Sequence, residues 1–233
     1  MSGRPFLTAQ WHHLLLLNYQ VEPRLLEPLV PRGTELDAWE GRTLISAVGF
    51  RFLDTAVLGV PVPGHRDFTE VNLRFYVRRR SPEGGWRRGV VFVRELVPKR
   101  WVAWIARLAY HEPYRRVPMR HDIRVSGLSA VEPGRVEYGW SYRGESCRIR
   151  GELPAPLRPL VRPSEAEFVT EHYWGYTRRR DGGTLEYEVR HPAWQVTDAT
   201  AARFDGDGSS LYGADLGAAM AGPPHSAFFA GGS

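Results

Sequence analysis

The segment 67–80, which reads DFTEVNLRFYVRRR, alternates between apolar and polar side chains, and it constrains the fold more than any other part of the chain. Four apolar side chains share one face of an extended strand: Val71, Leu73, Phe75 and Val77. Four polar or amphipathic ones share the other: Glu70, Asn72, Arg74 and Tyr76. Because successive side chains of a strand point to opposite faces, this period of two predicts a strand with one face in a core.

Turn and proline signals divide the rest of the chain into further strands and a few short helices. Residues 81–85, SPEGG, predict a turn that joins segment 67–80 to 86–97 in an antiparallel hairpin. Further strands are expected at 12–21, 41–55, 114–127, 134–144, 145–153, 173–180, 184–192 and 193–204. Helices are expected between Pro23 and Pro31, at 98–114, and after Ser164, which has capping-box spacing to Glu167.

About ten strands with two or three short helices do not alternate as a parallel βαβ sheet would. The pattern therefore predicts an α+β fold, an antiparallel β-barrel with two or three short helices. A length of 233 residues lies within the span of a single domain, so we expect residues 1–233 to form one. From Asp205 onward the Gly, Ala and Ser content predicts a loose tail, although SAFFA at 226–230 is apolar enough to dock.

The motifs of common metal and cofactor sites are missing from the sequence. Cys147 is the single cysteine, which excludes an internal disulfide, and no Cys/His cluster has zinc-site spacing. There is no phosphate loop, no HExxH and no GxSxG, and GDGSSLYG at 206–213 fails the dinucleotide fingerprint in its spacing and flanking elements. We therefore expect neither a metal nor a cofactor.

The charge balance points to a solvated surface. Basic residues outnumber acidic ones 31 to 26, which gives a formal net charge of +5. The excess is almost all arginine and is interleaved with Asp and Glu, which argues against a nucleic-acid partner. The apolar run Leu14 to Leu17 is too short for a signal peptide or a membrane span, so we expect a cytoplasmic protein without a membrane partner. Since open strand edges invite pairing, either sheet closure or a homo-oligomer is expected.

Several strings resemble those of the uncharacterised DUF2071, or YqjF-like, family. They include VPGHRDFTEVNLRFYV at 62–77, followed by VVFVREL, ARLAYHEPY and VPM, and later EHYWGYT, HPAW and LYGADL. The likeness covers nearly the whole chain, from HLLLLNYQVEP onward. That family is similar in fold to acetoacetate decarboxylase, so the resemblance implies a β-barrel with a ligand cavity inside its sheet.

Acetoacetate decarboxylase acts through a lysine that forms a Schiff base, and the resemblance can be followed residue by residue. In ARLAYHEPYR, Arg107 matches the family's arginine and Pro113 its proline, but Leu108 stands at the glutamate and Tyr114 at the lysine. A phenol cannot form an imine. Lys99 offers an alternative alignment beside the cation of Arg100, but it comes before the helix instead of after it. The resemblance therefore implies a pocket without its nucleophile.

The polar face of segment 67–80 supplies the first candidate ligand residues. A carboxylate, an amide and a guanidinium at alternate positions are too polar for an ordinary buried face, so Glu70, Asn72 and Arg74 face either solvent or a wet cavity. The resemblance favours the cavity for Glu70 and Asn72. Arg107 is a further candidate, because its fork can bind a carboxylate; its alternative is a structural salt bridge at the helix end.

Aromatic and titratable residues complete the candidate set. Tyr114 and His121 could supply a hydrogen-bond donor or a titrating group, the alternative for Tyr114 being a buried ring with its hydroxyl satisfied. Trp174, with Tyr176 and Trp194, suits the apolar wall of a pocket or, equally, the core.

These residues predict a protein that binds a small organic or lipophilic carboxylic ligand without Schiff-base chemistry. The alternative is an enzyme of lyase or hydrolase type that uses non-covalent acid/base chemistry by Glu70 with Tyr114 or His121. A structural role in a larger assembly is a third hypothesis. Because fold similarity does not transfer function, the sequence leaves open whether any reaction is catalysed.

Overall fold

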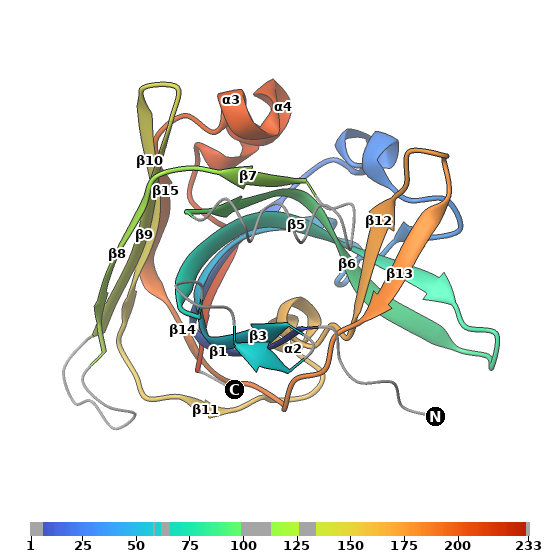
Figure 1. The fold of residues 1–233 in the computed structure, drawn as a ribbon, viewed down its shortest axis with the longest axis horizontal. Coiled ribbons are helices and arrows are strands. Elements are labelled where there is room, and N and C mark those ends of the chain that lie inside the picture. The colour runs from blue at the N-terminus through green and yellow to red at the C-terminus, as the bar shows by residue number, and fades with distance from the viewer. Residues whose placement is uncertain (1–6, 58, 62–65, 99–112, 126–133, 232–233) are drawn as a thin grey trace.

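The structure is a computed structural model that describes residues 7–57, 59–61, 66–98, 113–125 and 134–231 (Figure 1). The first strands are β1 (Leu7–Gln20), β2 (Glu35–Leu36), β3 (Leu44–Val57), β4 (Val60–Pro61), β5 (Phe68–Arg80), β6 (Trp86–Val97), β7 (Tyr114–Arg116) and β8 (Met119–Arg124). The later ones are β9 (Gly134–Tyr142), β10 (Glu145–Leu153), β11 (Arg158–Pro159), β12 (Trp174–Arg178), β13 (Thr184–Glu188), β14 (Gln195–Asp198), β15 (Thr200–Asp205) and β16 (Ser226–Ala230). Short helical elements are η1 (Pro23–Leu25), η2 (Glu27–Leu29), α2 (Glu165–Thr170), α3 (Ser209–Tyr212) and α4 (Ala214–Met220). The described chain is thus mostly β-sheet with few helices, as the strand patterns predict.

These strands form two sheets. The main, 12-stranded sheet runs in the order β11-β14-β16-β1-β3-β5-β6-β12-β13, and β2, β4 and β7 pair at its sides. The second sheet has 4 strands in the order β15-β10-β9-β8. The main sheet curls around α2, while the second sheet and α3 and α4 lie outside the curl (Figure 1). We call the side that faces α2 the inner face and the opposite side the outer face.

The expected closed antiparallel barrel is wrong. Among the described strands, the ends of the main sheet, β11 and β13, do not pair with each other, and β7 and β12 run parallel to β6. Two segments expected as single strands divide between the sheets: 114–127 becomes β7 and β8, and 193–204 becomes β14 and β15. Pro118, which has no N–H for a ladder, lies at the first of these breaks. Among the described strands, the main sheet is therefore open and mixed.

The hairpin of β5 and β6 is confirmed, and it lies at the middle of the main sheet. The strands pair in antiparallel register from Val71 opposite Leu96 to Arg80 opposite Trp86, with an irregularity after Leu73. The face with Val71 and Leu73 belongs to the outer core, as the alternation predicts. The opposite face of β5 is buried as well, because the curl of the sheet and α2 cover it.

The helix predictions have mixed outcomes. Ser164 caps α2 as expected, since its Oγ accepts a hydrogen bond from the backbone N–H of Glu167 at 3.1 Å. The segment between Pro23 and Pro31 forms the two 3-10 turns η1 and η2 instead of a single α-helix. The physical reason is Pro28, which lacks the N–H that a continuing helix needs. The helix expected at 98–114 falls almost wholly outside the described residues.

The loose tail expected after Asp205 is wrong, whereas the docking of SAFFA is confirmed. Residues 209–220 form α3 and α4, and β16 lies between β1 and β14 in the main sheet. Phe229 is only 2% exposed and belongs to the outer core. Composition is a poor guide here, because small residues in this segment allow close packing of α4, where Gly217 lies directly against Ser209.

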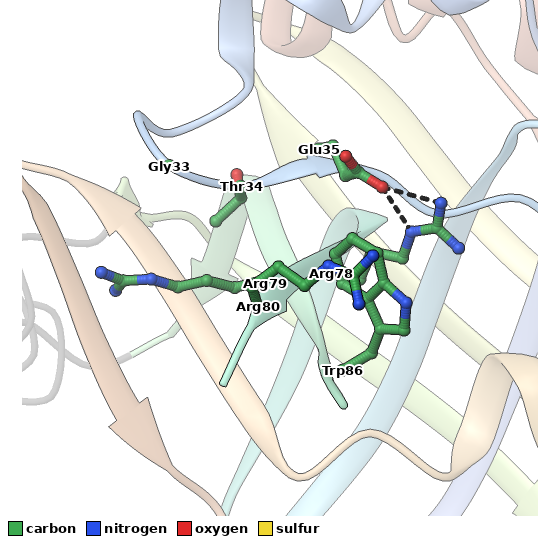
Figure 2. Close-up of a pocket in the computed structure, with 7 residues that line it drawn as sticks. All are labelled: Gly33, Thr34, Glu35, Arg78, Arg79, Arg80 and Trp86. Atoms are coloured by element: carbon green, nitrogen blue, oxygen red, sulfur yellow. Dashed lines mark hydrogen bonds and ion pairs between the residues drawn. The ribbon is translucent and has the colours of Figure 1, made fainter. Parts of the chain in front are cut away.

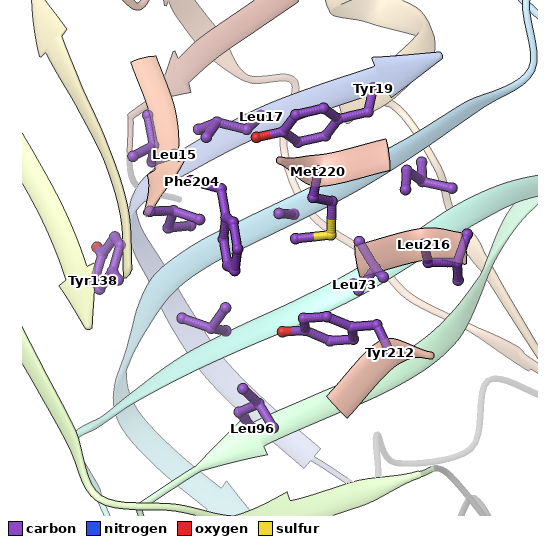
Figure 3. Close-up of a cluster of buried hydrophobic side chains, with 14 of the residues drawn as sticks. Leu15, Leu17, Tyr19, Leu73, Leu96, Tyr138, Phe204, Tyr212, Leu216 and Met220 are labelled. Carbon is purple, nitrogen blue, oxygen red and sulfur yellow. The ribbon is translucent and has the colours of Figure 1, made fainter. Parts of the chain in front are cut away.

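Apolar cores cover both faces of the main sheet. On the outer face, Leu73 and Leu96 pack with Tyr138 and Phe204 of the second sheet and with Met220 of α4 (Figure 3). A Cβ at Gly49 would lie 2.4 Å from the ring of Tyr138, so glycine lets the two sheets approach there. On the inner face, side chains of β1, β3, β5 and β6 pack against α2. In the described residues, no helix has the length and apolar character needed to cross a membrane.

Candidate functional site

The inner face of the main sheet carries a group of buried and half-buried polar residues, which we call the inner polar cluster: Glu70, Asn72, Arg74, Glu95 and Tyr114. Three of these lie at alternate positions of β5, so they share one face. Glu95 of β6 is directly opposite Asn72, and Tyr114 of β7 pairs in register with Glu95. Three neighbouring strands thus bring these side chains together.

The carboxylate of Glu70 accepts hydrogen bonds from Asn72 and Tyr114. The Asn72 side-chain amide donates to Oε1 at 3.1 Å, and the Tyr114 hydroxyl donates to Oε2 at 3.2 Å. Only 2% of Glu70 is exposed. A buried carboxylate costs free energy unless it is hydrogen-bonded, and these two contacts fix its orientation. The sequence left open whether Glu70 and Asn72 face solvent or a wet cavity; their burial excludes the solvent-facing alternative, and the ligand-binding role stays a prediction.

Glu95 brings a second carboxylate to the same place. It is 1% exposed and lies across the ladder from Asn72, which is 2% exposed. Side chains directly opposite each other in neighbouring antiparallel strands have Cβ atoms roughly 5 Å apart. Sequence reasoning missed Glu95, although the hairpin register of β5 and β6, once known, places it opposite Asn72.

Arg74 links the cluster to α2. Its Nη2 donates to the backbone carbonyl of Val169 at 2.7 Å, near the C-terminal end of that helix. A cation is favourable there because the last carbonyls of a helix carry partial negative charge. The Nε atom of Arg74 is buried and has no hydrogen-bond partner in the part of the chain that the structure describes. The Nε–H of Arg74 is therefore a buried donor that the described residues leave unpaired.

His172 follows α2 and packs on the same inner face, and sequence reasoning did not select it. Its ring lies 4.8 Å from that of Tyr76 and 5.7 Å from that of Phe168, measured between centroids. Neither ring nitrogen has a hydrogen-bond partner within the described ranges. Burial, and then the nearby charges of Arg74 and Arg88, hold the pKa of His172 well below its usual value, so the ring is neutral. The only sequence signal was its place in EHYWGYT.

A chain of hydrogen bonds behind the cluster anchors α2 to the sheet. Ser46 Oγ donates to Asn18 Oδ1 at 2.6 Å and also contacts the Tyr76 hydroxyl. Asn18 in turn donates to Ser226 Oγ at 2.9 Å, and that hydroxyl contacts Glu165 at the start of α2. Because these side chains satisfy one another, they serve the fold and are not available to a ligand.

Two of the candidate residues lie away from the inner polar cluster. His121 of β8 belongs to the second sheet, and its Nδ1 is 3.1 Å from Thr69 Oγ1, which points to the outer face of β5. Trp174 of β12 pairs in register with Gly89 and packs against the outer core, with the Arg87 guanidinium 4.5 Å from its ring centre. The structure therefore brings Tyr114 to Glu70 and Asn72, but not His121 or Trp174.

The remaining aromatic and basic candidates are divided. Tyr176 lies in the outer core, whereas Trp194 lies in the inner one. Lys99 and Arg107 fall outside the described residues. In the part that the structure describes, no three His, Cys, Asp or Glu side chains are grouped so that they could hold a metal ion.

Residues 8–233 match the model of a family described as an uncharacterized conserved protein, DUF2071. The chain belongs to the DUF2071 family. The family resemblance read from the sequence strings is thus confirmed. Among curated proteins, this DUF2071 chain is 28% identical over 208 residues to the uncharacterized protein YqjF of Bacillus subtilis (strain 168). The alignment covers 86% of this chain and 78% of YqjF.

Solved structures show what fold the DUF2071 chain shares. The enduracididine biosynthesis enzyme MppR, complexed with the condensation product of pyruvate and imidazole 4-carboxaldehyde, has a TM-score of 0.68 at 15% identity, with 99% of this chain and 86% of MppR covered. MppR has also been solved with pyruvate. Acetoacetate decarboxylase from Legionella pneumophila has a TM-score of 0.62 at 14% identity, with coverages of 97% and 83%. At such identities the likeness shows the fold, which is that of acetoacetate decarboxylase.

Proposed function

We propose that the inner face of the main sheet binds a small organic molecule that carries a carboxyl group, and that the inner polar cluster holds it non-covalently. The observation that carries this proposal is a set of buried polar atoms without hydrogen-bond partners among the described residues. They are Asn72 Oδ1, Arg74 Nε and both ring nitrogens of His172. Each such atom lowers the stability of the fold by about 1–3 kcal/mol unless a ligand or a water molecule forms a hydrogen bond with it.

The chemistry of these atoms favours a polar ligand with an anionic group. The planar fork of Arg74 matches a carboxylate, because parallel N–H groups can donate to its two oxygens. Asn72 Oδ1 accepts a hydrogen bond, which suits a hydroxyl or enol oxygen on the same molecule. MppR, a protein with the same fold, forms a complex with pyruvate, and this supports a small oxo acid as the ligand class.

Thermal denaturation with pyruvate or acetoacetate tests binding. A ligand at about 100 times its Kd stabilises the folded state by about 2.7 kcal/mol, which corresponds to a rise in Tm of roughly 5–11 °C for a chain of this size. We expect Arg74→Lys, which keeps the charge but loses the fork, to reduce this rise strongly. Arg148→Lys in the second sheet is the matched control and should leave it intact. The same assay with Arg107→Ala tests the arginine expected from the sequence.

The absence of a covalent imine is part of the proposal, and the composition makes it testable. Lys99 is the single lysine, so a Schiff base with a ketone has only this side chain and the N-terminal amine as sites. We expect borohydride reduction in the presence of pyruvate or a β-keto acid to add no mass to the intact protein. A mass increment that Lys99→Arg removes would contradict the non-covalent mechanism.

A second candidate function is acid/base catalysis by Glu70. Hydrogen bonds from Asn72 and Tyr114 orient this carboxylate as a general base would have to be oriented. Tyr114 takes the partner role here and His121 does not, because His121 lies on the outer side of β5. In this reaction Glu70 removes a proton from the carbon next to the ligand's carbonyl, which leaves an enolate that accepts a proton back.

Exchange of the pyruvate methyl protons with deuterated water, followed by proton NMR, tests this function. We expect the protein to catalyse exchange faster than buffer alone does. Glu70→Gln should abolish this catalysed exchange, and Tyr114→Phe should lower its rate by about 10²-fold or more. Saturable binding of pyruvate without any such exchange would leave a binding protein and exclude this enzyme function for pyruvate.

A further inference from the structure

A basic pocket lies where the C-terminal end of β5 is next to β2 (Figure 2). Its volume is about 610 Å³, within the range of small-molecule sites. Seven residues line it: Gly33, Thr34, Glu35, Arg78, Arg79, Arg80 and Trp86. This pocket shares no residue with the inner polar cluster, and the proposed function does not use it.

Strand register explains why the basic residues gather there. Arg78 pairs with Glu35 of β2, and Arg80 pairs with Trp86 at the start of β6. Arg78 and Arg80 lie at alternate positions of β5 and therefore share a face, while Arg79 points the other way. The chain reaches β2 through Gly33, whose φ of 79° lies in the left-handed region that glycine adopts without strain.

The positive charges of the pocket are only partly balanced. The Arg78 guanidinium contacts Glu35 through both Nε and Nη2 at 2.7 Å. Arg79 reaches Glu186 of β13 at 3.3 Å, a carboxylate that Arg87 also contacts at 2.8 Å. Arg80 has no ion pair within the described part of the chain. Since Arg79 points away and is paired with Glu186, the face that carries Arg78, Arg80 and Glu35 has a net charge of +1.

Trp86 holds two of these guanidinium groups in place. The guanidinium carbons of Arg78 and Arg80 lie 4.3 and 3.9 Å from the centre of the Trp86 ring. Cation–π contact restrains long side chains that would otherwise move freely, and it does not use their N–H donors. Both guanidinium groups are therefore restrained against the Trp86 ring before any ligand arrives.

From this geometry we infer that the basic pocket is a second ligand site, which binds the phosphate group of a small phosphate monoester. Above its second pKa, near 6, such a group carries almost two negative charges, which attract the net positive charge of the face with Arg78, Arg80 and Glu35. It offers three acceptor oxygens to the donors of Arg78 and Arg80. A carboxylate offers the same donors only two acceptor oxygens and one negative charge.

Isothermal titration with inorganic phosphate at about pH 7.5, where the dianion dominates, tests the site. We expect saturable binding of one phosphate per chain. Arg80→Gln should weaken it by at least about tenfold, because a hydrogen bond to a charged group is lost. Arg180→Gln is the matched control: it removes the same charge from the similar string YTRRRDGG, but from a hairpin without this pocket. It should change the affinity by less than about twofold.

Several outcomes would overturn the assignment. Equal weakening by Arg80→Gln and Arg180→Gln would mean that phosphate responds to net charge alone. If acetate bound as tightly as phosphate, the pocket would not be specific for a phosphate group and the inference would be wrong. Binding to phosphatidic acid vesicles that inorganic phosphate does not displace would indicate a lipid surface instead of a small molecule. Since Arg80 lies outside the inner polar cluster, pyruvate binding in Arg80→Gln reports separately on the proposed function.

Discussion

Acidification is expected to destabilise the folded chain through His172. Its ring is buried against the rings of Tyr76 and Phe168, and its pKa in the folded state lies well below the ordinary value of 6.5 that it regains on unfolding. The unfolded chain therefore binds the proton more readily. The stabilising effect of the neutral ring is fully present above about pH 6.5 and is lost as the pH falls below it.

The magnitude follows from the linkage relation. If the folded ring stays neutral at about pH 5, the unfolded state gains about 2 kcal/mol from protonation, or 1.36 kcal/mol for each of 1.5 pH units. His172→Phe keeps an aromatic ring of similar size but cannot titrate. Between about pH 7.5 and pH 5, the wild type should therefore lose about 2 kcal/mol more stability than His172→Phe, which is roughly 4–8 °C in Tm.

Urea denaturation at the two pH values, followed by tryptophan fluorescence, measures the difference. Other titrating groups are common to both proteins and cancel. Phe168→Leu is the control, because it perturbs the same ring cluster without removing a titrating group, and it should lower stability equally at both pH values. Identical pH dependence in the wild type and His172→Phe would refute the argument that this ring is held neutral by burial.

Two further predictions concern the packing of the main sheet. Gly49→Ala should lower the free energy of unfolding by about 1–3 kcal/mol, since its Cβ would lie 2.4 Å from the Tyr138 ring. The same substitution should lower it by less in a chain that already carries Tyr138→Leu. Additive effects of the two substitutions in denaturation would contradict a steric clash. Phe229→Ala should lower the free energy of unfolding by about 3–5 kcal/mol, because Phe229 is buried on β16, which is paired on both sides by β1 and β14. A decrease below about 0.5 kcal/mol would mean that the C-terminal segment is not docked.

Local patterns were enough to find most strands. The period of two in 67–80 and the SPEGG turn specify β5, β6 and their pairing, because both depend on residues close in sequence. The same holds for the Ser164 cap of α2. Local patterns did not predict that segment 193–204 divides into two strands, β14 and β15, in different sheets. The alternation of side chains within a strand carries no information on which strand it pairs with.

The candidate site shows the same division. The alternation identified Glu70, Asn72 and Arg74 as sharing a face that is too polar for an ordinary core. It could not tell that α2 covers this face, nor that Glu95 lies opposite Asn72. Tyr114 was selected for its place in a family motif, and its contact with Glu70 depends on the parallel pairing of β7 with β6.

The strand content, the family and the sharing of faces thus follow from the amino-acid sequence alone, because these depend on neighbours along the chain. The folded chain was needed to show that the described strands of the main sheet do not close, that β16 enters this sheet, and that His121 and Trp174 lie away from Glu70. Those features depend on contacts between segments far apart in sequence. Their free energy comes from burial and pairing across the whole molecule, so a local pattern carries no record of them.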